Sequence, residues 1–482
     1  MTVRRSILLL LLALLGALAV RLALTSPLGH DDVEHLHTAW LISQGHRPFL
    51  DFFQKQSPLF WMLLQPATFL GGNDLLAFAL LGRLTMLLGL LATVLGVLAL
   101  GRLVARSSAS AWAAPLLLLA SPTLLYNLVA IRPDGLMAAA LVWAVVLLAR
   151  KSSAALLGAG FLLGLASTLL LKAVPSAILM TLCASLVAAQ AAPTGDGSSG
   201  NRPDARRGLP AAWKTLGLLA AGGLLAVAPF LLWLHLAGLL EGFWFTNVTF
   251  NGWLYASPLA EDVPRSSRLA TILLAMLRNE PWLPLVTVSS FLLLRSFVKR
   301  PRTGDRRFIS LRGGATGRTL FLLLVLSATN LLLLVPNHLP FYSYFLLPLL
   351  SGVALSPALL ERLLDRFEHH RLEWRTPGTV RGLAIPALLT VLLAGTIAGF
   401  GLAGYQRFAS SEGQIRKLAD LPRDRDAYDL PDHPVFLVDR HYVWDNVDRY
   451  LDTLRRMDRS GALPDWVRER CVDQLHPVPP GR

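Results

Sequence analysis

The stretch Gly29-His30-Asp31-Asp32-Val33-Glu34-His35-Leu36-His37 follows closely on the apolar run of residues 6–25. Six of its nine side chains can titrate. Ionisable side chains are costly inside hydrocarbon, so this segment must lie in water or in a protected cleft at a membrane surface. Its position therefore predicts a membrane protein with a polar site beside the end of its first helix.

The composition of the whole chain indicates an all-α polytopic membrane protein. Its 482 residues have a mean hydropathy of +0.51 and only 16% are charged, against about 25% in soluble proteins. A transmembrane helix needs roughly 20 apolar residues. Apolar runs that predict about eleven transmembrane helices occur at residues 6–25, 76–101, 109–128, 136–150, 153–171, 174–192, 215–236, 282–299, 319–336, 342–360 and 382–404.

The first loop is expected to hold two juxtamembrane helices. Residues 32–44 carry apolar side chains at helical spacing, and residues 57–70 form a shorter apolar run interrupted by proline. The second run is too short to span the bilayer and suits a helix lying in the interface.

The basic residues predict the orientation of the chain. Arginine and lysine are dense in alternate loops, such as residues 295–318, and sparse in the loops between them. By the positive-inside rule the N-terminus is cytoplasmic and residues 29–37 are extracytoplasmic. The same distribution accounts for the net charge of +14, so no nucleic-acid partner is expected. We divide the chain into a transmembrane domain (1–404) and a small tail (405–482), which an odd number of helices would place outside the cytoplasm.

A second candidate site lies in the next extracytoplasmic loop, Ile131-Arg132-Pro133-Asp134-Gly135. Asp134 would lie at the same membrane face as Asp31, and two carboxylates there suit general-base work, acceptor orientation or metal binding. The alternative is that Arg132 and Asp134 pair to cap helix ends. Lys172 follows an apolar run and could snorkel to the surface or neutralise a lipid-linked phosphate.

Two further features are ambiguous. A divalent metal held by Asp31 with His35, or by Glu34 with His37, is a minor alternative. The mixed set fits no tight structural zinc pattern, so neither a resident metal nor another cofactor is expected. Tyr342, in a late outer loop, fits either an interfacial aromatic belt or a substrate contact.

Taken together, these motifs resemble those of the GT-C glycosyltransferases, most closely the family 39 type that includes protein O-mannosyltransferases, and the aminoarabinose transferases of lipid A. Residues 31–37 are similar to the Asp-Glu-x-Glu-His-Leu-His variant of bacterial members, with Asp32 in place of the usual glutamate. Residues 45–53 match Gly-x-x-Pro-aromatic-x-Asp-Phe-Phe. Residues 132–135 are similar to the second acidic site, Lys172 falls where many members carry lysine, and residues 340–348 resemble a late Tyr/Pro-rich segment. The resemblance covers most of residues 1–360 and is strongest in 29–62.

The resemblance implies a GT-C-like helical bundle in the bacterial inner membrane that transfers a hexose or pentose from a polyprenyl-phosphate donor. The acceptor would be a hydroxyl or phosphate of a glycolipid such as lipid A, a polysaccharide or a protein, in lipopolysaccharide or other cell-envelope glycan synthesis, and inversion is expected. Asp31 is the candidate base, supported by Asp134 or Asp32. The candidate substrate contacts are Glu34, His35, His37, Asp51, Lys55, Arg132, Lys172 and Tyr342.

The main alternative is a transporter or flippase of lipid-linked sugars that uses the same charged residues as a relay. Transporters usually place such charges near the bilayer midplane and show repeated halves. Here the charges gather at one face and no clear repeat is evident, which favours the transferase.

Overall fold

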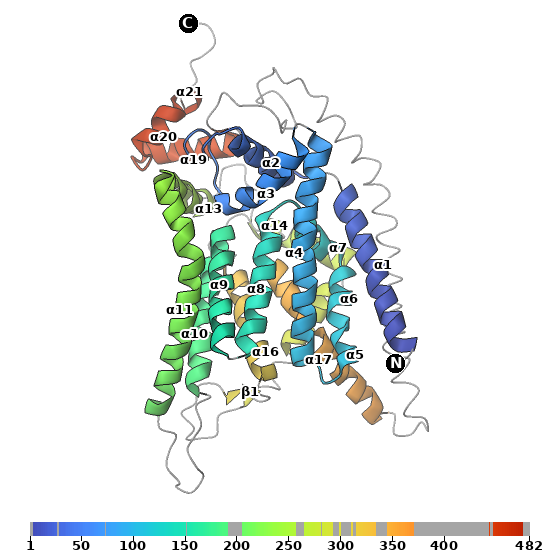
Figure 1. The fold of residues 1–482 in the computed structure, drawn as a ribbon. Helices are drawn as coiled ribbons and strands as arrows, with labels where there is room; N and C mark the ends of the chain where they lie inside the picture. Colours follow the sequence, from blue (N-terminus) through green and yellow to red (C-terminus); the bar gives the residue numbers. More distant parts are fainter. Residues whose placement is uncertain are drawn as a thin grey trace.

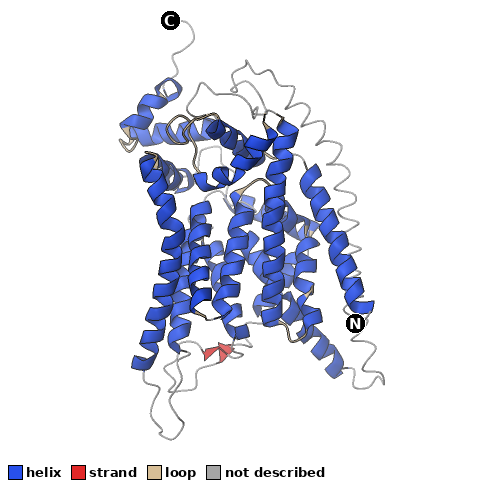
Figure 2. Cartoon of the chain, in the orientation of Figure 1, coloured by secondary structure: helices blue, strands red, loops and turns tan. Residues whose placement is uncertain are grey.

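The described residues of the structure, a computed structural model, form a bundle of helices with one short antiparallel pair of strands (Figures 1 and 2). The structure describes residues 3–26, 28–72, 74–150, 152–190, 205–256, 265–280, 282–292, 298–299, 310–311, 315–333, 345–370, 443 and 447–475. This architecture confirms the all-α polytopic prediction. The predicted span at 382–404, Tyr342 and the proposed boundary at 404/405 lie outside the described residues.

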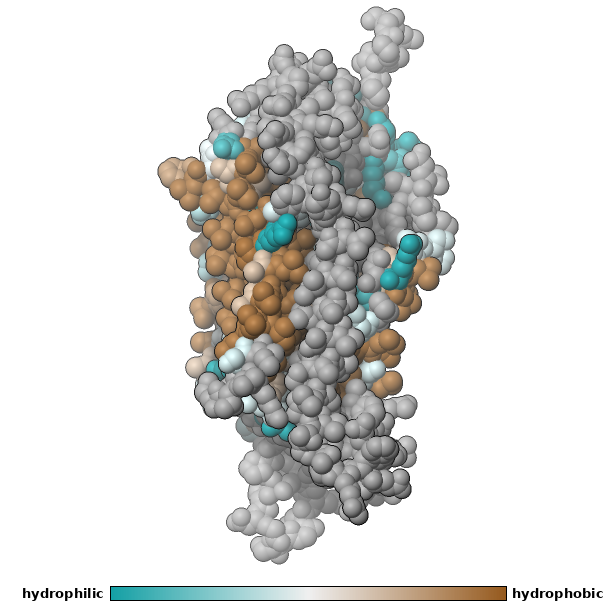
Figure 3. Space-filling view, turned by 90° about the vertical axis from the view of Figure 1, so that its right-hand side faces the viewer, coloured by the Kyte–Doolittle hydropathy of each residue, from teal (hydrophilic) through white to brown (hydrophobic). Residues whose placement is uncertain are grey.

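Five described helices are long and apolar enough to cross a membrane, or six if a bent pair counts as one span. The five are α1 (Val3–Thr25), α4 (Leu75–Val104), α8 (Pro133–Arg150), α10 (Val174–Gln190) with the preceding turn η1 (Leu171–Ala173), and α11 (Ala205–Leu236). On the face shown in Figure 3, the described side chains are mostly hydrophobic, as a lipid-facing surface requires.

The predicted count of eleven is not confirmed within the described residues. The run at 109–128 is broken into α5 (Ser108–Ala111), α6 (Ala113–Leu119) and α7 (Pro122–Val129), with a bend of 70° before α7. The bend falls at Ser121-Pro122, where proline begins a helix but cannot continue one. Shorter apolar elements are α9 (Ser153–Leu169), α14 (Arg265–Asn279), α15 (Trp282–Leu292) and α16 (Ala315–Leu332), and α17 (Leu346–His370) completes the bundle.

Small residues allow close packing between α9 and α11. A Cβ atom on Gly222 would lie 2.0 Å from the carbonyl oxygen of Leu157, and one on Gly160 would lie 2.2 Å from that of Leu219. In a membrane, where helices gain little from hydrophobic association, such backbone contact is a main source of attraction between them.

One end of the bundle carries the elements that build the site. Helix α2 (His30–Ser43) and helix α3 (Pro58–Gly71) lie there across the end of α4 (Figure 1), which confirms the two helices predicted in the first loop. Helix α3 buries Phe60, Trp61 and Leu64 and exposes Phe69 and Leu70, as an interfacial helix would. Strand β1 (Val298–Lys299), paired antiparallel with β2 (Ser310–Leu311), lies at the opposite end (Figure 1).

The C-terminal helices lie at the same end as α2 and α3 (Figure 1). They are α19 (Val447–Arg459), α20 (Asp465–Arg470) and α21 (Val472–Leu475). Their apolar residues form one cluster with Phe53, with the π-helical turn η2 (Phe245–Phe250) that follows α12 (Leu240–Trp244), and with α13 (Asn251–Ala256). These three helices are therefore packed onto the membrane part of the protein.

Candidate active site

Asp32 anchors the start of α2 to the bundle. Its carboxylate accepts hydrogen bonds from the backbone N–H of Gly29, at 2.7 Å, and from that of Ile131, and it lies 2.9 Å from the guanidinium of Arg83 in α4. Arg83 also donates to the carbonyl of Val129, at 2.9 Å. Both side chains of the ion pair are almost fully buried. This saturated arrangement favours a structural role for Asp32 in place of the catalytic one expected for it.

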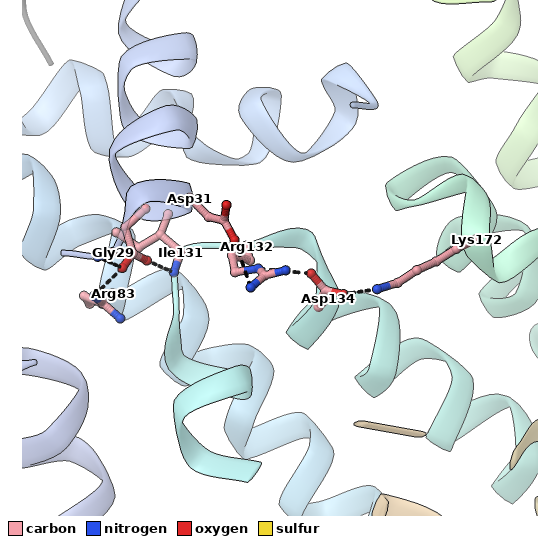
Figure 4. A network of polar contacts seen from close by, with 8 residues as sticks. Gly29, Asp31, Arg83, Ile131, Arg132, Asp134 and Lys172 are labelled. Carbon is pink, nitrogen blue, oxygen red and sulfur yellow. Dashed lines mark hydrogen bonds and ion pairs between the residues drawn. The ribbon is translucent and has the colours of Figure 1, made fainter. Parts of the chain in front are cut away.

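A row of alternating charges runs from α2 across the start of α8 to η1 (Figure 4). The guanidinium of Arg132 lies 2.9 Å from a carboxylate oxygen of Asp31 and 3.3 Å from one of Asp134. The other carboxylate oxygen of Asp134 accepts a hydrogen bond from the ammonium of Lys172. The order Asp31, Arg132, Asp134, Lys172 joins three separate segments of the chain, so the predicted convergence of Asp31 and Asp134 is seen in the structure.

The backbone explains why these residues converge. Asp31 lies in the first turn of α2, Pro133 and Asp134 open α8, and Lys172 lies in the single turn η1 between α9 and α10. Carboxylates are favoured near the positive end of a helix, where the first N–H groups have no helical partner. Arg132 lies just before α8 and spans the gap between two such helix starts.

The exposure of the row is uneven. The side chain of Asp31 is 41% exposed, those of Arg132 and Lys172 are 25% and 18% exposed, and that of Asp134 is only 5% exposed. Asp31 is therefore the carboxylate of the row most accessible to a substrate, and Asp134 serves as a buried counter-charge that holds two cations. The alternative expectation, that Arg132 and Asp134 pair at a helix end, is also seen in the structure. The same pairing orients Arg132 toward Asp31.

His35 lies behind the row in the interior of α2. Its Nδ1 accepts a hydrogen bond from the indole N–H of Trp61, at 2.9 Å, and its ring contacts that of Phe60 edge-on. Burial lowers the pKa of His35 to about 4, and the charges of Asp31 and Arg132 act on it in opposite directions. The imidazole is therefore neutral at physiological pH.

Glu34 and His37 are also buried, and His37 stacks on Trp40 at 6.0 Å between ring centroids. From the sequence, both are candidate substrate contacts, as is His35. Their burial within α2 favours a structural role instead.

Three hydrogen bonds fix the segment around Lys55 to other elements of the fold. The amide of Gln54 donates to Thr38 in α2, the amide of Asn251 donates to the carbonyl of Lys55 at 3.1 Å, and the hydroxyl of Ser57 donates to the carbonyl of Thr168 at the end of α9. The α2–α3 connection (residues 44–57) therefore links the helix of Asp31 to the helix that precedes Lys172.

Two predicted positions are not part of this row. Asp51 accepts from the backbone of Arg47 at 2.7 Å and pairs with its side chain at 3.4 Å, closing a local turn. Tyr342 lies outside the described residues. Among the described residues, no group of three or more His, Cys, Asp or Glu side chains is arranged to hold a metal ion.

Three residues that support the site were not identified from the sequence. Arg83 interrupts an apolar run and could have been noticed as an ionisable residue within a predicted span. Asn247 is buried in η2 and donates to the carbonyl of Gln56 at 3.3 Å. Tyr450, in α19, accepts a hydrogen bond from Lys55, which lies 395 residues earlier in the sequence. No local sequence pattern predicts such a contact.

Comparison with known proteins identifies the fold. No family model matches the sequence, and the search of curated proteins finds no significant match. Among solved structures, ArnT from Cupriavidus metallidurans bound to undecaprenyl phosphate aligns over 95% of this chain and 89% of its own, with a TM-score of 0.60 and 12% identity. The archaeal oligosaccharyltransferase AglB from Archaeoglobus fulgidus, in complex with an inhibitory peptide and a dolichol-phosphate, aligns over 98% of this chain and 60% of its own, with a TM-score of 0.50 and 14% identity. Both are GT-C fold glycosyltransferases, and this chain has the GT-C fold.

Proposed function

We propose that this protein is a membrane glycosyltransferase that moves a sugar from a polyprenyl-phosphate donor to an acceptor hydroxyl at the extracytoplasmic face. The observation that carries the proposal is the row of Asp31, Arg132, Asp134 and Lys172, in which an accessible carboxylate lies beside Arg132 and a second cation, Lys172, follows across Asp134. Such a site can take a proton from an acceptor and bind a phosphate in the same place.

The chemistry follows from the order of the row. The carboxylate of Asp31 accepts the proton of the acceptor hydroxyl as its oxygen attacks the anomeric carbon. The bond from that carbon to the phosphate oxygen breaks, and the polyprenyl phosphate leaves with the electron pair. Arg132, Lys172 and Lys55 stabilise the developing negative charge, so the leaving group needs little help from an acid. Inversion in a single displacement is what the family resemblance implies.

Asp134 has a different role in this scheme. Its carboxylate contacts both Arg132 and Lys172. Because this carboxylate is buried, it holds the two cations at a fixed spacing. A donor phosphate that reaches them shares these cations with Asp134. Asp134 thus positions the phosphate-binding cations and keeps Arg132 against Asp31.

The comparisons support a lipid-linked donor. ArnT is seen with undecaprenyl phosphate and AglB with dolichol-phosphate, and both carriers keep the donor in the membrane. The distribution of basic residues supports an extracytoplasmic site, because strand β1, which falls within the arginine- and lysine-rich residues 295–318, lies at the other end of the bundle from α2 (Figure 1). The acceptor is a glycolipid, polysaccharide or protein of the cell envelope.

The test is sugar transfer by purified protein from undecaprenyl-phosphate-linked sugars, with a cell-envelope extract as the acceptor and mass spectrometry as the readout. Asp31→Asn is expected to abolish transfer while the protein is produced and folds normally. Asp51→Asn is the matched control, because Asp51 pairs locally with Arg47, and it is expected to keep near-normal activity. Full activity in Asp31→Asn would exclude the proposed base. Labelling of a cysteine at position 31 only from the cytoplasm would exclude the proposed face.

A further inference from the structure

The C-terminal helices contact the α2–α3 connection through an aromatic cluster. Tyr450 is buried between Phe53 of the connection and Phe250 of η2, with ring centroids 5.7 Å and 5.6 Å away, and Phe53 and Phe250 contact each other at 4.8 Å. Aromatic pairs in such edge and tilted arrangements add stability beyond the area they bury. The position of Tyr450 is therefore fixed by packing and does not depend on its hydroxyl.

The hydroxyl of Tyr450 contacts the ammonium of Lys55. It accepts a hydrogen bond from Nζ, which also lies 4.6 Å from the centroid of the Tyr450 ring. This hydrogen bond orients the ammonium of Lys55, as Asp134 orients that of Lys172.

The backbone of Lys55 is fixed by other elements. Its carbonyl accepts from Asn251, and the next carbonyl, that of Gln56, accepts from Asn247. These two bonds fix the backbone of Lys55 without the C-terminal helices. The C-terminal helices contribute by directing its long side chain. A lysine side chain loses rotamer freedom when it is held, so a contact that orients it in advance has a measurable effect on binding.

The position of Lys55 relates it to the charged row. Its neighbour Gln54 donates to Thr38 of α2, the helix of Asp31, and Ser57 donates to the carbonyl of Thr168, just before Lys172. The segment of Lys55 thus joins the two parts of the chain that carry the ends of the row, and the C-terminal helices contact it through Tyr450.

We infer that Tyr450 is a positioning residue, which directs the ammonium of Lys55 toward the phosphate of the lipid-linked donor, and that the C-terminal helices are part of the donor site. This inference rests on the proposed function and extends it to the tail. It makes donor binding dependent on a residue nearly 400 positions away in sequence.

Tyr450→Phe tests the inference by removing one oxygen atom and keeping the packed ring. A hydrogen bond to a charged group contributes about 1.5–3 kcal/mol, and every 1.4 kcal/mol is a factor of ten. The KM for the undecaprenyl-phosphate donor is expected to rise about tenfold, with kcat within about a factor of two and an unchanged thermal midpoint. Tyr255→Phe, which removes a hydroxyl from the same aromatic cluster, is the control and should leave KM unchanged. An unchanged donor KM in Tyr450→Phe would overturn the inference.

A second measurement does not require transfer activity. Lys55 in the full-length protein is labelled with an amine-reactive reagent, and the labelled peptide is quantified by mass spectrometry. Labelling is expected to be faster in Tyr450→Phe than in the wild type. Undecaprenyl phosphate should protect Lys55 in the wild type, more weakly in Tyr450→Phe, and undecaprenol should protect neither.

The two measurements separate failure of the inference from failure of the proposed function. An inactive wild type whose Lys55 is protected by undecaprenyl phosphate, with weaker protection in Tyr450→Phe, would count against the transferase proposal and support the role of Tyr450. Equal labelling and equal protection in the two proteins would overturn the inference, whatever the activity of the wild type.

Discussion

The guanidinium of Arg83 lies 2.9 Å from the carboxylate of Asp32, and both side chains are at least 96% buried. The pair joins α2 to α4 directly beside the exposed neighbour Asp31. Removing one member of a buried, hydrogen-bonded pair leaves the other charge uncompensated, which costs about 3–5 kcal/mol. Asp31 can face a substrate only if α2 is held in place, so the stability of this pair and the function of the site are connected.

Arg83→Ala is therefore expected to lower the stability of the protein by about 3–5 kcal/mol, measured as the shift in unfolding midpoint of detergent-solubilised protein. Arg47→Ala is the control, because its partner Asp51 lies in an exposed turn and exposed pairs contribute little. A midpoint for Arg83→Ala equal to that of Arg47→Ala would contradict the structural role of the Asp32–Arg83 pair.

The different environments of Asp31 and Asp32 could not be predicted from the sequence. The sequence places both residues beside the end of the first span, and it places Asp134 at the same face. Successive residues of a helix point about 100° apart, so one of the two faces Arg83 and the other Arg132. Which one does so depends on the rotation of α2 about its axis, and contacts from α4 and residues 129–132 set that rotation.

The long transmembrane helices, in contrast, could be predicted from the sequence. Runs of apolar residues predicted α1, α4, α8 and α11, because length and hydropathy decide whether a segment can span a bilayer. The break before α7 falls at Ser121-Pro122, a local signal inside the predicted run at 109–128. The contact of Tyr450 with Lys55 depends on tertiary packing, and no window of local sequence contains that information.

Lys172→Gln tests the assignment of a cation to the donor phosphate. The variant keeps a hydrogen-bond donor beside Asp134 and removes the charge, so the KM for the donor is expected to rise about tenfold or more, with a smaller effect on kcat. Lys214→Gln, at an exposed position near the start of α11, should resemble the wild type. Steady-state transfer assays at varied donor concentration would show this, and an unchanged KM in Lys172→Gln would remove Lys172 from the phosphate site.

His35 predicts a dependence of stability on pH. Burial lowers its pKa to about 4 in the folded protein, from an ordinary value of 6.5. Between these values the unfolded chain binds the proton and the folded one does not, so stability is full above about pH 6.5 and falls as the pH drops toward 4. The loss from this residue reaches roughly 3 kcal/mol at the bottom of the window.

His35→Gln should reduce this dependence, since glutamine does not titrate and its side-chain carbonyl can accept from Trp61. Thermal midpoints of the two proteins at pH 7.5, 6.0 and 5.0 provide the comparison. The wild type is expected to lose more on acidification than His35→Gln. Parallel curves would mean that His35 does not remain neutral in the folded state.

Gly242 controls the packing of the α2–α3 connection. Phe49 in that connection has a φ of 70°, an uncommon conformation for a bulky residue, and its buried ring packs against Phe243 at 6.1 Å between centroids. A Cβ atom on Gly242 would lie 2.6 Å from the Cβ of Phe49. Phe49 is already strained, so it has little room to move away from an added methyl group.

Gly242→Ala is therefore expected to destabilise the protein by about 1–3 kcal/mol, as overpacking of a full core does. It should also raise the donor KM, because the same connection carries Lys55. Gly217→Ala is the matched control, since nothing lies within 4 Å of a Cβ at that position of α11 and alanine favours a helix. Unfolding midpoints and transfer kinetics of the two variants test the prediction together. A loss of stability with normal donor binding would separate the packing of Phe49 from the placement of Lys55.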